Sequence, residues 1–294
     1  MSIEGRMFSR NAAKNDAIRD AAIPLPEGIV QLRNISYGIH KESSLLDVYY
    51  PENTTAPLPT IVSVHGGGYV YGTKEVYRRY CMDLSRRGFT VVNFNYRLAP
   101  KWRFPTPLFD TNSVLTWVEK NANQYHIDTD KVFLVGDSAG AQIASQYAAI
   151  HTNPDYAALF PIKPAKLTIR ALGLHCGLYD AAARAAEKRM GIQQDYLGRL
   201  STADPRLRVL ENITNNYPPA FIATSCCDFL RDNAEPMYHF LTEKGIPAQW
   251  KCYGTEGDET VGHVFHVNLN LPEATQCNND TVAFFRNYLY EKRN

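Results

Sequence analysis

The sequence predicts an α/β protein in which a mostly parallel sheet of eight strands has helices on both faces. From about residue 60 onward, short runs rich in β-branched and aromatic residues alternate with segments of helical spacing. Several of these runs are apolar along most of their length, which is typical of strands covered on both sides. Ligand sites in such sheets form at the carboxyl ends of the strands.

Eight segments have the composition of strands and are bounded by turn residues. They are residues 29–39, 44–51, 59–66, 89–97, 131–138, 167–177, 219–228 and 247–254. The segments with helical spacing that alternate with them or close the chain are 75–88, 104–125, 139–153, 233–245 and 278–292. The alternation from about residue 60 onward predicts a parallel arrangement of most strands.

Two further segments lie outside this alternation, and the second of them fits poorly as a sheet crossover. Residues 7–27 are polar and irregularly helical, and residues 180–215 contain one alanine-rich helix, 181–190, in an otherwise irregular stretch. We expect both to contribute to a helical cap on a single domain that spans 7–294. Residues 1–6 contain Ile-Glu-Gly-Arg, which resembles a protease recognition site left by expression vectors, and are interpreted as a tag remnant. A natural N-terminus is the alternative.

Composition narrows the range of partners. The 294 residues carry a formal net charge of +1, with 31 basic and 30 acidic side chains and no basic block, so we expect no nucleic-acid partner. No apolar stretch approaches the ~20 residues that span a bilayer, so we expect no stable membrane association. The six cysteines lack the spacing of a zinc site, which favours mostly buried, reduced thiols in a cytoplasmic protein.

A serine between glycines lies where a buried strand meets a helix. The pentapeptide Gly-Asp-Ser-Ala-Gly at 136–140 leaves no room for a loop between strand and helix. Such a turn needs small neighbours because the serine adopts a strained backbone that exposes its hydroxyl. The helix N-terminus would also favour developing negative charge there. The context predicts a nucleophilic Ser138, and a glycine-rich turn without chemistry is the alternative.

Three short motifs together carry a family resemblance. They are His-Gly-Gly-Gly at 65–68, Tyr-Arg-Leu-Ala-Pro at 96–100 and Gly-Asp-Ser-Ala-Gly at 136–140. They resemble the motifs of the hormone-sensitive-lipase-like branch of the α/β-hydrolases, over a region from about residue 45 to the C-terminus. The resemblance implies an α/β-hydrolase fold with a cap and a serine carboxylesterase that needs no metal or cofactor. Lys101 and Ala141 depart from the family pattern, but neither position supplies a catalytic group.

The glycine run suits the charge that develops during attack on an ester. The carbonyl oxygen becomes negative, and one backbone N–H group directed at it is worth roughly 3 kcal/mol. Side chains would block that approach, so glycine is the residue that fits. The resemblance implies that Gly67, Gly68 and Ala139 supply these amides and form the oxyanion hole. We expect His65 to be a structural hydrogen-bonding residue of the loop.

A serine nucleophile needs a base and a carboxylate that orients the base. In this fold the chain order is serine, acid, histidine. Asp-Phe-Leu-Arg-Asp at 228–232 resembles the family's Asp-x-Leu-x-Asp, which selects Asp228, with Asp232 as the alternative. His-Val-Phe at 263–265 resembles the family's His-x-Phe, which selects His263, with His266 as the competitor.

The sequence thus predicts hydrolysis of short-chain carboxylic esters through an acyl-enzyme. A deacetylase of sugar esters and an amide hydrolase such as a formamidase or peptidase are alternatives on the same scaffold. A non-catalytic receptor is disfavoured because all three triad members are present. A small-molecule ester is the expected partner, and a homodimer is left open. Tyr69 and Tyr71 are candidate substrate-binding residues, and Trp102 and Phe104 also flank the motifs, with core packing as the alternative for each.

Overall fold

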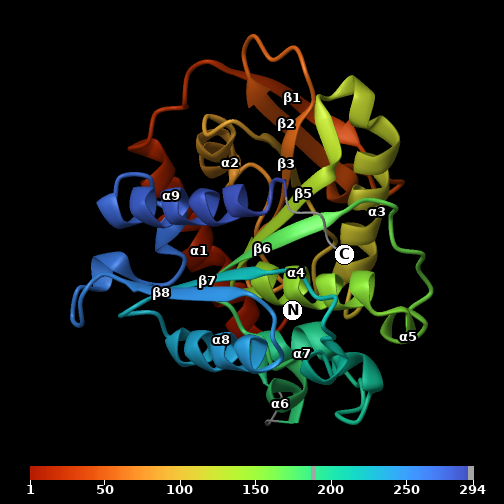
Figure 1. Ribbon diagram of the computed structural model, residues 1–294. Helices are drawn as coiled ribbons and strands as arrows, with labels where there is room; N and C mark the ends of the chain where they lie inside the picture. The colour runs from red at the N-terminus through yellow and green to blue at the C-terminus, as the bar shows by residue number, and fades with distance from the viewer. Residues whose placement is uncertain (187–189, 291–294) are drawn as a thin grey trace.

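A computed structural model describes residues 1–186 and 190–290 and contains a single eight-stranded sheet (Figure 1). The strands are β1 (Ile29–Ser36), β2 (Leu45–Pro51), β3 (Leu58–Val64), β4 (Thr90–Phe94), β5 (Ile127–Asp137), β6 (Ile169–His175), β7 (Ala220–Ser225) and β8 (Ala248–Tyr253). Their spatial order is β1-β2-β4-β3-β5-β6-β7-β8. β2 pairs antiparallel with β1 and β4, whereas every other pair is parallel. The predicted mostly parallel sheet is confirmed.

Helices cover both faces of this sheet, as predicted (Figure 1). The helices are α1 (Ile3–Ala21), α2 (Arg78–Ser85), α3 (Thr106–Asn121), α4 (Ala139–Thr152), α5 (Pro154–Ala157), α6 (Ala181–Ala186), α7 (Gly191–Leu197), α8 (Ala234–Glu243) and α9 (Pro272–Asn287). Short 3₁₀ turns lie at Lys41–Ser44 (η1), Ala122–Gln124 (η2), Pro205–Leu207 (η3), Leu210–Asn212 (η4), Arg231–Asn233 (η5), Glu259–Val261 (η6) and Phe265–Val267 (η7). α3, α4 and α8 pack on one face, and α2 and α9 pack on the other.

The core is divided by the sheet into two apolar layers. Successive side chains of a strand point to opposite faces, so Leu134 of β5 joins the layer beneath α3 and α4, while its neighbour Phe133 joins the layer beneath α2 and α9. Both side chains are fully buried. The near-continuous apolar strands recognised in the sequence are therefore those that face helices on both sides.

Some helix boundaries differ from the expected ones. α9 begins at Pro272, upstream of the expected 278–292, because proline is well suited to the first turn of a helix, where its missing N–H is not needed. The expected helix 181–190 is described only as α6 (Ala181–Ala186), since residues 187–189 lie outside the described part of the chain. α7, which follows at Gly191–Leu197, was not expected.

The N-terminal helix lies against α7. α1 starts at Ile3, so most of the segment interpreted as a tag remnant is helical and packed rather than separate from the fold. Ser2 caps α1 by accepting a hydrogen bond from the Gly5 amide, and its own amide and hydroxyl donate to the Asp195 carboxylate of α7 at 2.9 and 2.7 Å. The origin of residues 1–6 and the division into domain and cap stay predictions.

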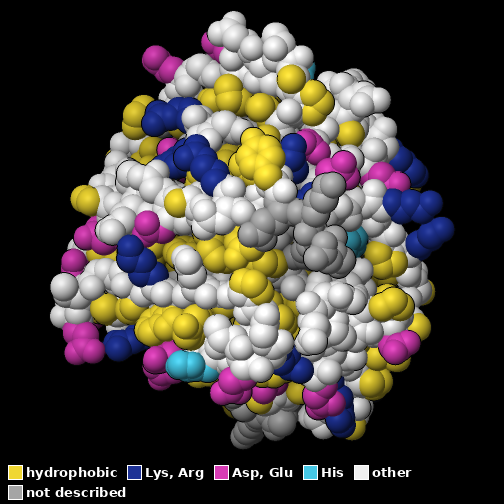
Figure 2. Space-filling model, in the orientation of Figure 1, with side chains coloured by type: hydrophobic (Ala, Val, Ile, Leu, Met, Phe, Trp, Pro, Cys, Tyr) yellow, Lys and Arg dark blue, Asp and Glu magenta, His cyan; other side chains and the backbone are white. Residues whose placement is uncertain are grey.

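Charged side chains of both signs are interspersed on the molecular face seen in Figure 2. None of the helices among residues 1–186 and 190–290 combines the length and apolarity needed to cross a membrane.

Replacement of Phe285 by alanine tests the packing of the layer beneath α9. The Phe285 side chain is fully buried and stacks on Phe133 with ring centroids 4.5 Å apart. Its ring also occupies the space beside Gly173. We expect Phe285→Ala to lower the free energy of unfolding by about 3–5 kcal/mol in urea denaturation. The control Ile39→Ala, at a side chain 90% exposed, should change it by less than about 0.5 kcal/mol. Equal effects of the two variants would contradict this packing.

Candidate active site

Ser138 lies at a sharp turn between β5 and α4. Its backbone has φ 51° and ψ −117°, a conformation that non-glycine residues rarely adopt. A Cβ atom on Gly140 would come within 2.0 Å of the Val64 carbonyl oxygen, and one on Gly136 within 2.4 Å of the Gly140 carbonyl oxygen. The Ser138 amide donates to the His175 carbonyl of β6 at 2.9 Å. The turn therefore tolerates no side chain at either glycine.

Two hydrogen bonds join Ser138, His263 and Asp228, although they are far apart in the sequence. The distance from Ser138 Oγ to His263 Nε2 is 3.0 Å, and that from His263 Nδ1 to Asp228 Oδ1 is 2.7 Å. His263 lies in the loop between η6 and η7, and Asp228 follows β7. The structure thus brings together the three residues selected as a triad, with the imidazole between the hydroxyl and the carboxylate.

The Asp228 carboxylate is buried and accepts several hydrogen bonds. Besides His263, the Thr224 hydroxyl donates to Oδ2 and the Leu230 amide donates to Oδ1, both at 2.9 Å. Burial raises the pKa of Asp228, but the hydrogen bond and positive charge of His263 outweigh it and hold that pKa below its ordinary value. The carboxylate is ionised at neutral pH and fixes the orientation of the imidazole ring.

The competing acid and base lie elsewhere. Asp232 is exposed on η5. His266 is fully buried, with its ring 5.2 Å from that of Tyr80 and 4.4 Å from that of His175. Burial lowers the pKa of His266 well below its ordinary value, so this imidazole is neutral. It is a core side chain in this structure.

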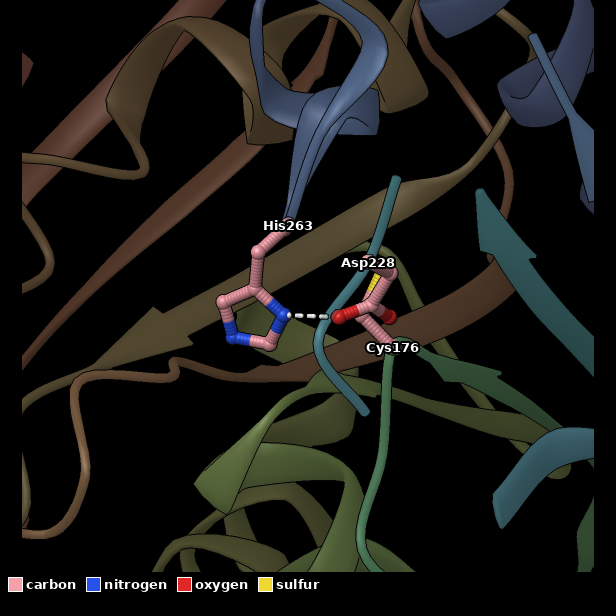
Figure 3. Close-up of side chains that lie close together, drawn as sticks. All are labelled: Cys176, Asp228 and His263. Atoms are coloured by element: carbon pink, nitrogen blue, oxygen red, sulfur yellow. Dashed lines mark hydrogen bonds and ion pairs between the residues drawn. The ribbon is translucent and has the colours of Figure 1, made fainter. Parts of the chain in front are cut away.

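Cys176 lies beside the acid and the base, a neighbour that the sequence did not reveal. Figure 3 shows its side chain next to Asp228, with His263 on the other side of the carboxylate. Its sulfur accepts a hydrogen bond from the Val264 amide at 3.4 Å. Cys176 Sγ lies within 4.8 Å of one oxygen of Asp228 and one ring nitrogen of His263, which also lie within 4.8 Å of each other. Among the described residues, this is the one cluster of three side chains that could together bind a metal ion. Burial raises the pKa of the Cys176 thiol well above its ordinary value, so the sulfur is protonated.

The glycine loop after β3 has a backbone that favours glycine. Gly67 and Gly68 have φ of 106° and 58°, and a Cβ on Gly67 would lie 2.2 Å from the Tyr71 carbonyl oxygen. Within residues 1–186 and 190–290, the amides of Gly67, Gly68 and Ala139 donate to no protein acceptor. All three residues line cavities that also reach Ser138. These amides are therefore free to bind an anionic oxygen.

Buried side chains hold this loop in place. The Tyr77 hydroxyl accepts from the Gly66 amide at 3.0 Å and donates to Asp137 Oδ2 at 2.7 Å. His65 Nδ1 lies 2.8 Å from the Gly66 carbonyl oxygen, and the His65 ring stacks on Tyr96 at 4.0 Å. His65 thus has the structural surroundings expected for it. Asp137, next to the nucleophile, is linked through Tyr77 to the start of the glycine loop.

Two cavities meet at Ser138. The first has a volume of about 470 Å³ and mostly apolar walls, and the second, of about 550 Å³, has walls of both polar and apolar side chains. Tyr69 lines the first and stacks on Tyr196 at 3.7 Å, while Tyr71 lines the second and donates a hydrogen bond to Asp16 at 2.8 Å. Of the other candidates, Phe104 lines the first cavity, whereas Trp102 lines neither. Three aromatic residues of the first cavity's wall were not singled out in the sequence analysis: Phe8, Tyr196 and Phe229.

Comparison with known proteins agrees with this architecture. A family model described as alpha/beta hydrolase fold matches residues 61–267, which include the glycine loop and all three triad residues. The chain belongs to the hormone-sensitive-lipase-like carboxylesterase family. This protein is accordingly a carboxylic ester hydrolase.

Relatives of the carboxylesterase cover most of its length. An acetyl esterase of Salmonella choleraesuis is 26% identical over 95% of this chain and 83% of its own. A versiconal hemiacetal acetate esterase of Dothistroma septosporum is 26% identical over 90% of this chain and 82% of its own. Among solved structures, esterase B from Lactobacillus rhamnosis superposes with a TM-score of 0.86 at 24% identity, covering 97% of this chain and 93% of that one. The structural likeness supports the fold.

The pH dependence of stability should reveal the buried Asp137 carboxyl of this carboxylesterase. Burial raises the pKa of Asp137 to about 7, although the hydrogen bond from Tyr77 opposes this shift. The unfolded value is about 3.9. Between these two pH values Asp137 keeps its proton in the folded state but loses it in the unfolded state. The free energy of unfolding therefore falls as pH rises through this range.

Asp137→Asn removes that titration. The unfolding free energy of the wild type should therefore fall relative to that of the variant as pH rises from about 4 to about 7, measured by urea denaturation at each pH. A difference between the two proteins that stays constant across this range would contradict a raised pKa at Asp137.

Proposed function

We propose that this carboxylesterase hydrolyses short-chain esters with Ser138 as nucleophile, His263 as general base and Asp228 as the carboxylate that orients the base. The observation that carries the proposal is the continuous hydrogen-bonded chain from Ser138 Oγ through His263 to Asp228, at 3.0 and 2.7 Å. The same hydroxyl faces two cavities and lies near amides that lack a protein acceptor. This combination suits acyl transfer.

In the first half of the reaction, Ser138 Oγ attacks the ester carbon while His263 Nε2 takes its proton. The carbonyl oxygen becomes an oxyanion and accepts hydrogen bonds from the amides of Gly67, Gly68 and Ala139, which form the oxyanion hole in this proposal. Asp228 stays ionised and stabilises the imidazolium. His263 then gives its proton to the alcohol oxygen, the ester C–O bond breaks, and the acyl group is left on Ser138.

In the second half, water replaces the alcohol. His263 removes a proton from water, whose oxygen attacks the acyl carbon, and the same amides bind the second oxyanion. The C–O bond to Ser138 breaks, and the hydroxyl regains its proton from His263. The carboxylic acid leaves, and the enzyme returns to its starting state. None of these steps requires a metal or cofactor.

The proposed preference for short acyl groups has two supports. Part of the wall of the apolar cavity of about 470 Å³ consists of buried side chains, including Leu207 at 1%, Tyr196 at 4% and Leu197 at 8% exposure. Two relatives are named for acetate esters, the acetyl esterase and the versiconal hemiacetal acetate esterase. An apolar cavity of this volume limits the length of an acyl chain that fits without displacing core residues.

A reducing, cytoplasmic location is also proposed. All six cysteines are free, and Cys226 and Cys252 share a thiol hydrogen bond at 3.3 Å rather than a disulfide. Cys81, Cys176 and Cys277 are buried. The other three cysteines are only half-buried, so half of the cysteines are buried and not most of them, as the sequence had suggested. The homodimer stays a prediction.

Replacement of the nucleophile tests the proposed roles. Ser138→Ala should lower kcat for p-nitrophenyl acetate by about 10⁶-fold, since the remaining groups do not act without the nucleophile. The melting temperature should stay near that of the wild type or rise. Ser113→Ala, on α3 and away from both cavities, is the control and should keep full activity. Esterase turnover retained by Ser138→Ala would refute the assignment.

Acyl-chain length tests the proposed substrate class. The specificity constant kcat/KM should be higher for p-nitrophenyl acetate, butyrate and octanoate than for the laurate, because the apolar cavity of about 470 Å³ leaves limited room for a longer acyl chain. The measurement is initial rates below KM with each ester in solution. A preference for the laurate would exclude the short-chain assignment while leaving the triad intact.

A further inference from the structure

A dipeptide at the end of β6, His175-Cys176, contacts all three segments that carry the proposed triad. The Ser138 amide donates to the His175 carbonyl at 2.9 Å. The Cys176 sulfur lies within 4.8 Å of an oxygen of the Asp228 carboxylate (Figure 3). The same sulfur accepts a hydrogen bond at 3.4 Å from the amide of Val264, the residue after the proposed base. The proposed mechanism gives Cys176 no role, so this meeting point needs an explanation of its own.

The backbone of Cys176 takes its side chain out of the alternation of the strand. Along β6, Ala171 belongs to the apolar layer beneath α9, and Leu174 belongs to the layer beneath α4. Continued alternation would place Cys176 with Leu174, yet its side chain belongs to the layer of Ala171. Cys176 has φ 49°, a value that favours glycine, and its amide donates to the Ala223 carbonyl of β7 at 2.7 Å. This conformation directs the sulfur to the acid and the base.

The residue bonded to this sulfur has a strained backbone as well. Val264 has φ 62° and ψ 28°, the left-handed conformation, which is rare for a β-branched side chain. Such conformations persist only where the surroundings enforce them, and they cluster at functional sites. The hydrogen bond to the Cys176 sulfur holds the Val264 amide in this conformation. Because Val264 directly follows His263, the same bond fixes the backbone from which the imidazole enters the site.

The sulfur connects segments that the other partners of the acid do not connect. Thr224 and Leu230, which also donate to the Asp228 carboxylate, lie four and two residues from it in the chain. They orient the carboxylate within its own segment. Cys176 belongs to another strand and contacts both Asp228 and the backbone beside His263. It therefore ties the position of the acid to that of the base.

Burial keeps the thiol in the form that this position needs. Cys176 is 1% exposed, and burial raises its pKa well above the ordinary value, so the sulfur carries its proton. A neutral thiol can accept a hydrogen bond from an amide and act as a weak donor to a carboxylate. A thiolate in its place would repel Asp228, whose negative charge stabilises the imidazolium in the proposed mechanism. The side chain thus suits a positioning role rather than a nucleophilic one.

We propose that Cys176 is a positioning residue for the ester hydrolysis, because its sulfur holds the Asp228 carboxylate and the backbone beside His263 in a fixed relation. The inference rests on the proposed function and adds a residue to it. Cys176 lines neither cavity at Ser138, so it acts through the acid and the base rather than on the substrate. Both halves of the reaction use the same imidazole, so loss of the sulfur should slow acylation and deacylation together.

Replacement of the cysteine by glycine is the sharpest test. Because φ 49° is favourable for glycine, Cys176→Gly removes the sulfur without adding backbone strain. We expect kcat for p-nitrophenyl butyrate to fall about 10- to 100-fold, the cost of a small misplacement of catalytic groups. KM should stay within about threefold, since a contact that matters in the transition state alone leaves substrate binding unchanged. A kcat equal to that of the wild type in the folded variant would overturn the proposal.

Replacement by serine separates hydrogen bonding from the filling of space. The hydroxyl introduced by Cys176→Ser can accept from the Val264 amide and donate to the Asp228 carboxylate, so kcat should stay within about threefold of the wild type. If Cys176→Ser were as slow as Cys176→Gly, the role of the sulfur as a hydrogen-bonding partner would be excluded. If urea denaturation shows that Cys176→Gly does not fold, Cys176→Ala carries the same test.

A second buried cysteine provides the matched control. Cys81, on α2, is fully buried in the same apolar layer as Cys176 and lines neither cavity. Cys81→Ala therefore removes a buried thiol from the same layer without touching the proposed acid or base. We expect this variant to lose stability in urea while kcat is unchanged. A kcat as low in Cys81→Ala as in Cys176→Gly would show a general effect of core packing and would overturn the proposal.

The two levels of inference fail in different ways. If the wild type does not hydrolyse p-nitrophenyl butyrate, or if Ser138→Ala is as active as the wild type, the proposed function is wrong. If the wild type hydrolyses this ester through Ser138 while Cys176→Gly and Cys176→Ala keep its kcat, the esterase assignment stands and only the positioning role of Cys176 is excluded.

Discussion

The structure depends on a backbone contact too close for any side chain, where α4 crosses the end of β3. Gly140 lies so near the Val64 carbonyl that a Cβ atom would be 2.0 Å from its oxygen. This approach holds Ser138 at a φ of 51°, a conformation that costs of order 1–3 kcal/mol and persists only when its surroundings enforce it. The buried strands on either side, and the hydrogen bond from the Ser138 amide to the His175 carbonyl, hold the turn in this conformation. The strain directs the hydroxyl out of the sheet toward His263.

Two carboxylates near this turn behave oppositely because their surroundings differ. Asp228 receives hydrogen bonds from His263, Thr224 and Leu230, and its pKa lies below the ordinary value. Asp137 is buried with Tyr77 as its donor, and its pKa rises to about 7. One carboxylate thus suits a permanent negative charge beside an imidazole, and the other suits a hydrogen-bonded anchor for the glycine loop. Burial raises the pKa of both carboxyl groups, and the direct hydrogen bond and charge of His263 reverse that shift only at Asp228.

The local features of the site could be predicted from the sequence, and the long-range ones could not. The turn at Ser138 is encoded by adjacent residues, so its strand, glycines and helix were recognisable together. Asp228 and His263 were selected only through family resemblance, because no local pattern says that residues 125 apart, Ser138 and His263, will meet. The place of Phe8 in the cavity walls was missed because it exists only once α1 packs over the glycine loop, which follows it by several strands' length of chain.

Covalent labelling measures the central claim most directly, namely that the fold makes one serine hydroxyl reactive through the imidazole of His263. The wild type and a His263→Ala variant are treated with diethyl p-nitrophenyl phosphate, release of p-nitrophenol is followed, and the modified residue is located by peptide mass spectrometry. The account predicts one phosphoryl group per chain, on Ser138, in the wild type and labelling slower by orders of magnitude in His263→Ala. Labelling at another residue, or at Ser138 with equal rates in both proteins, would contradict it.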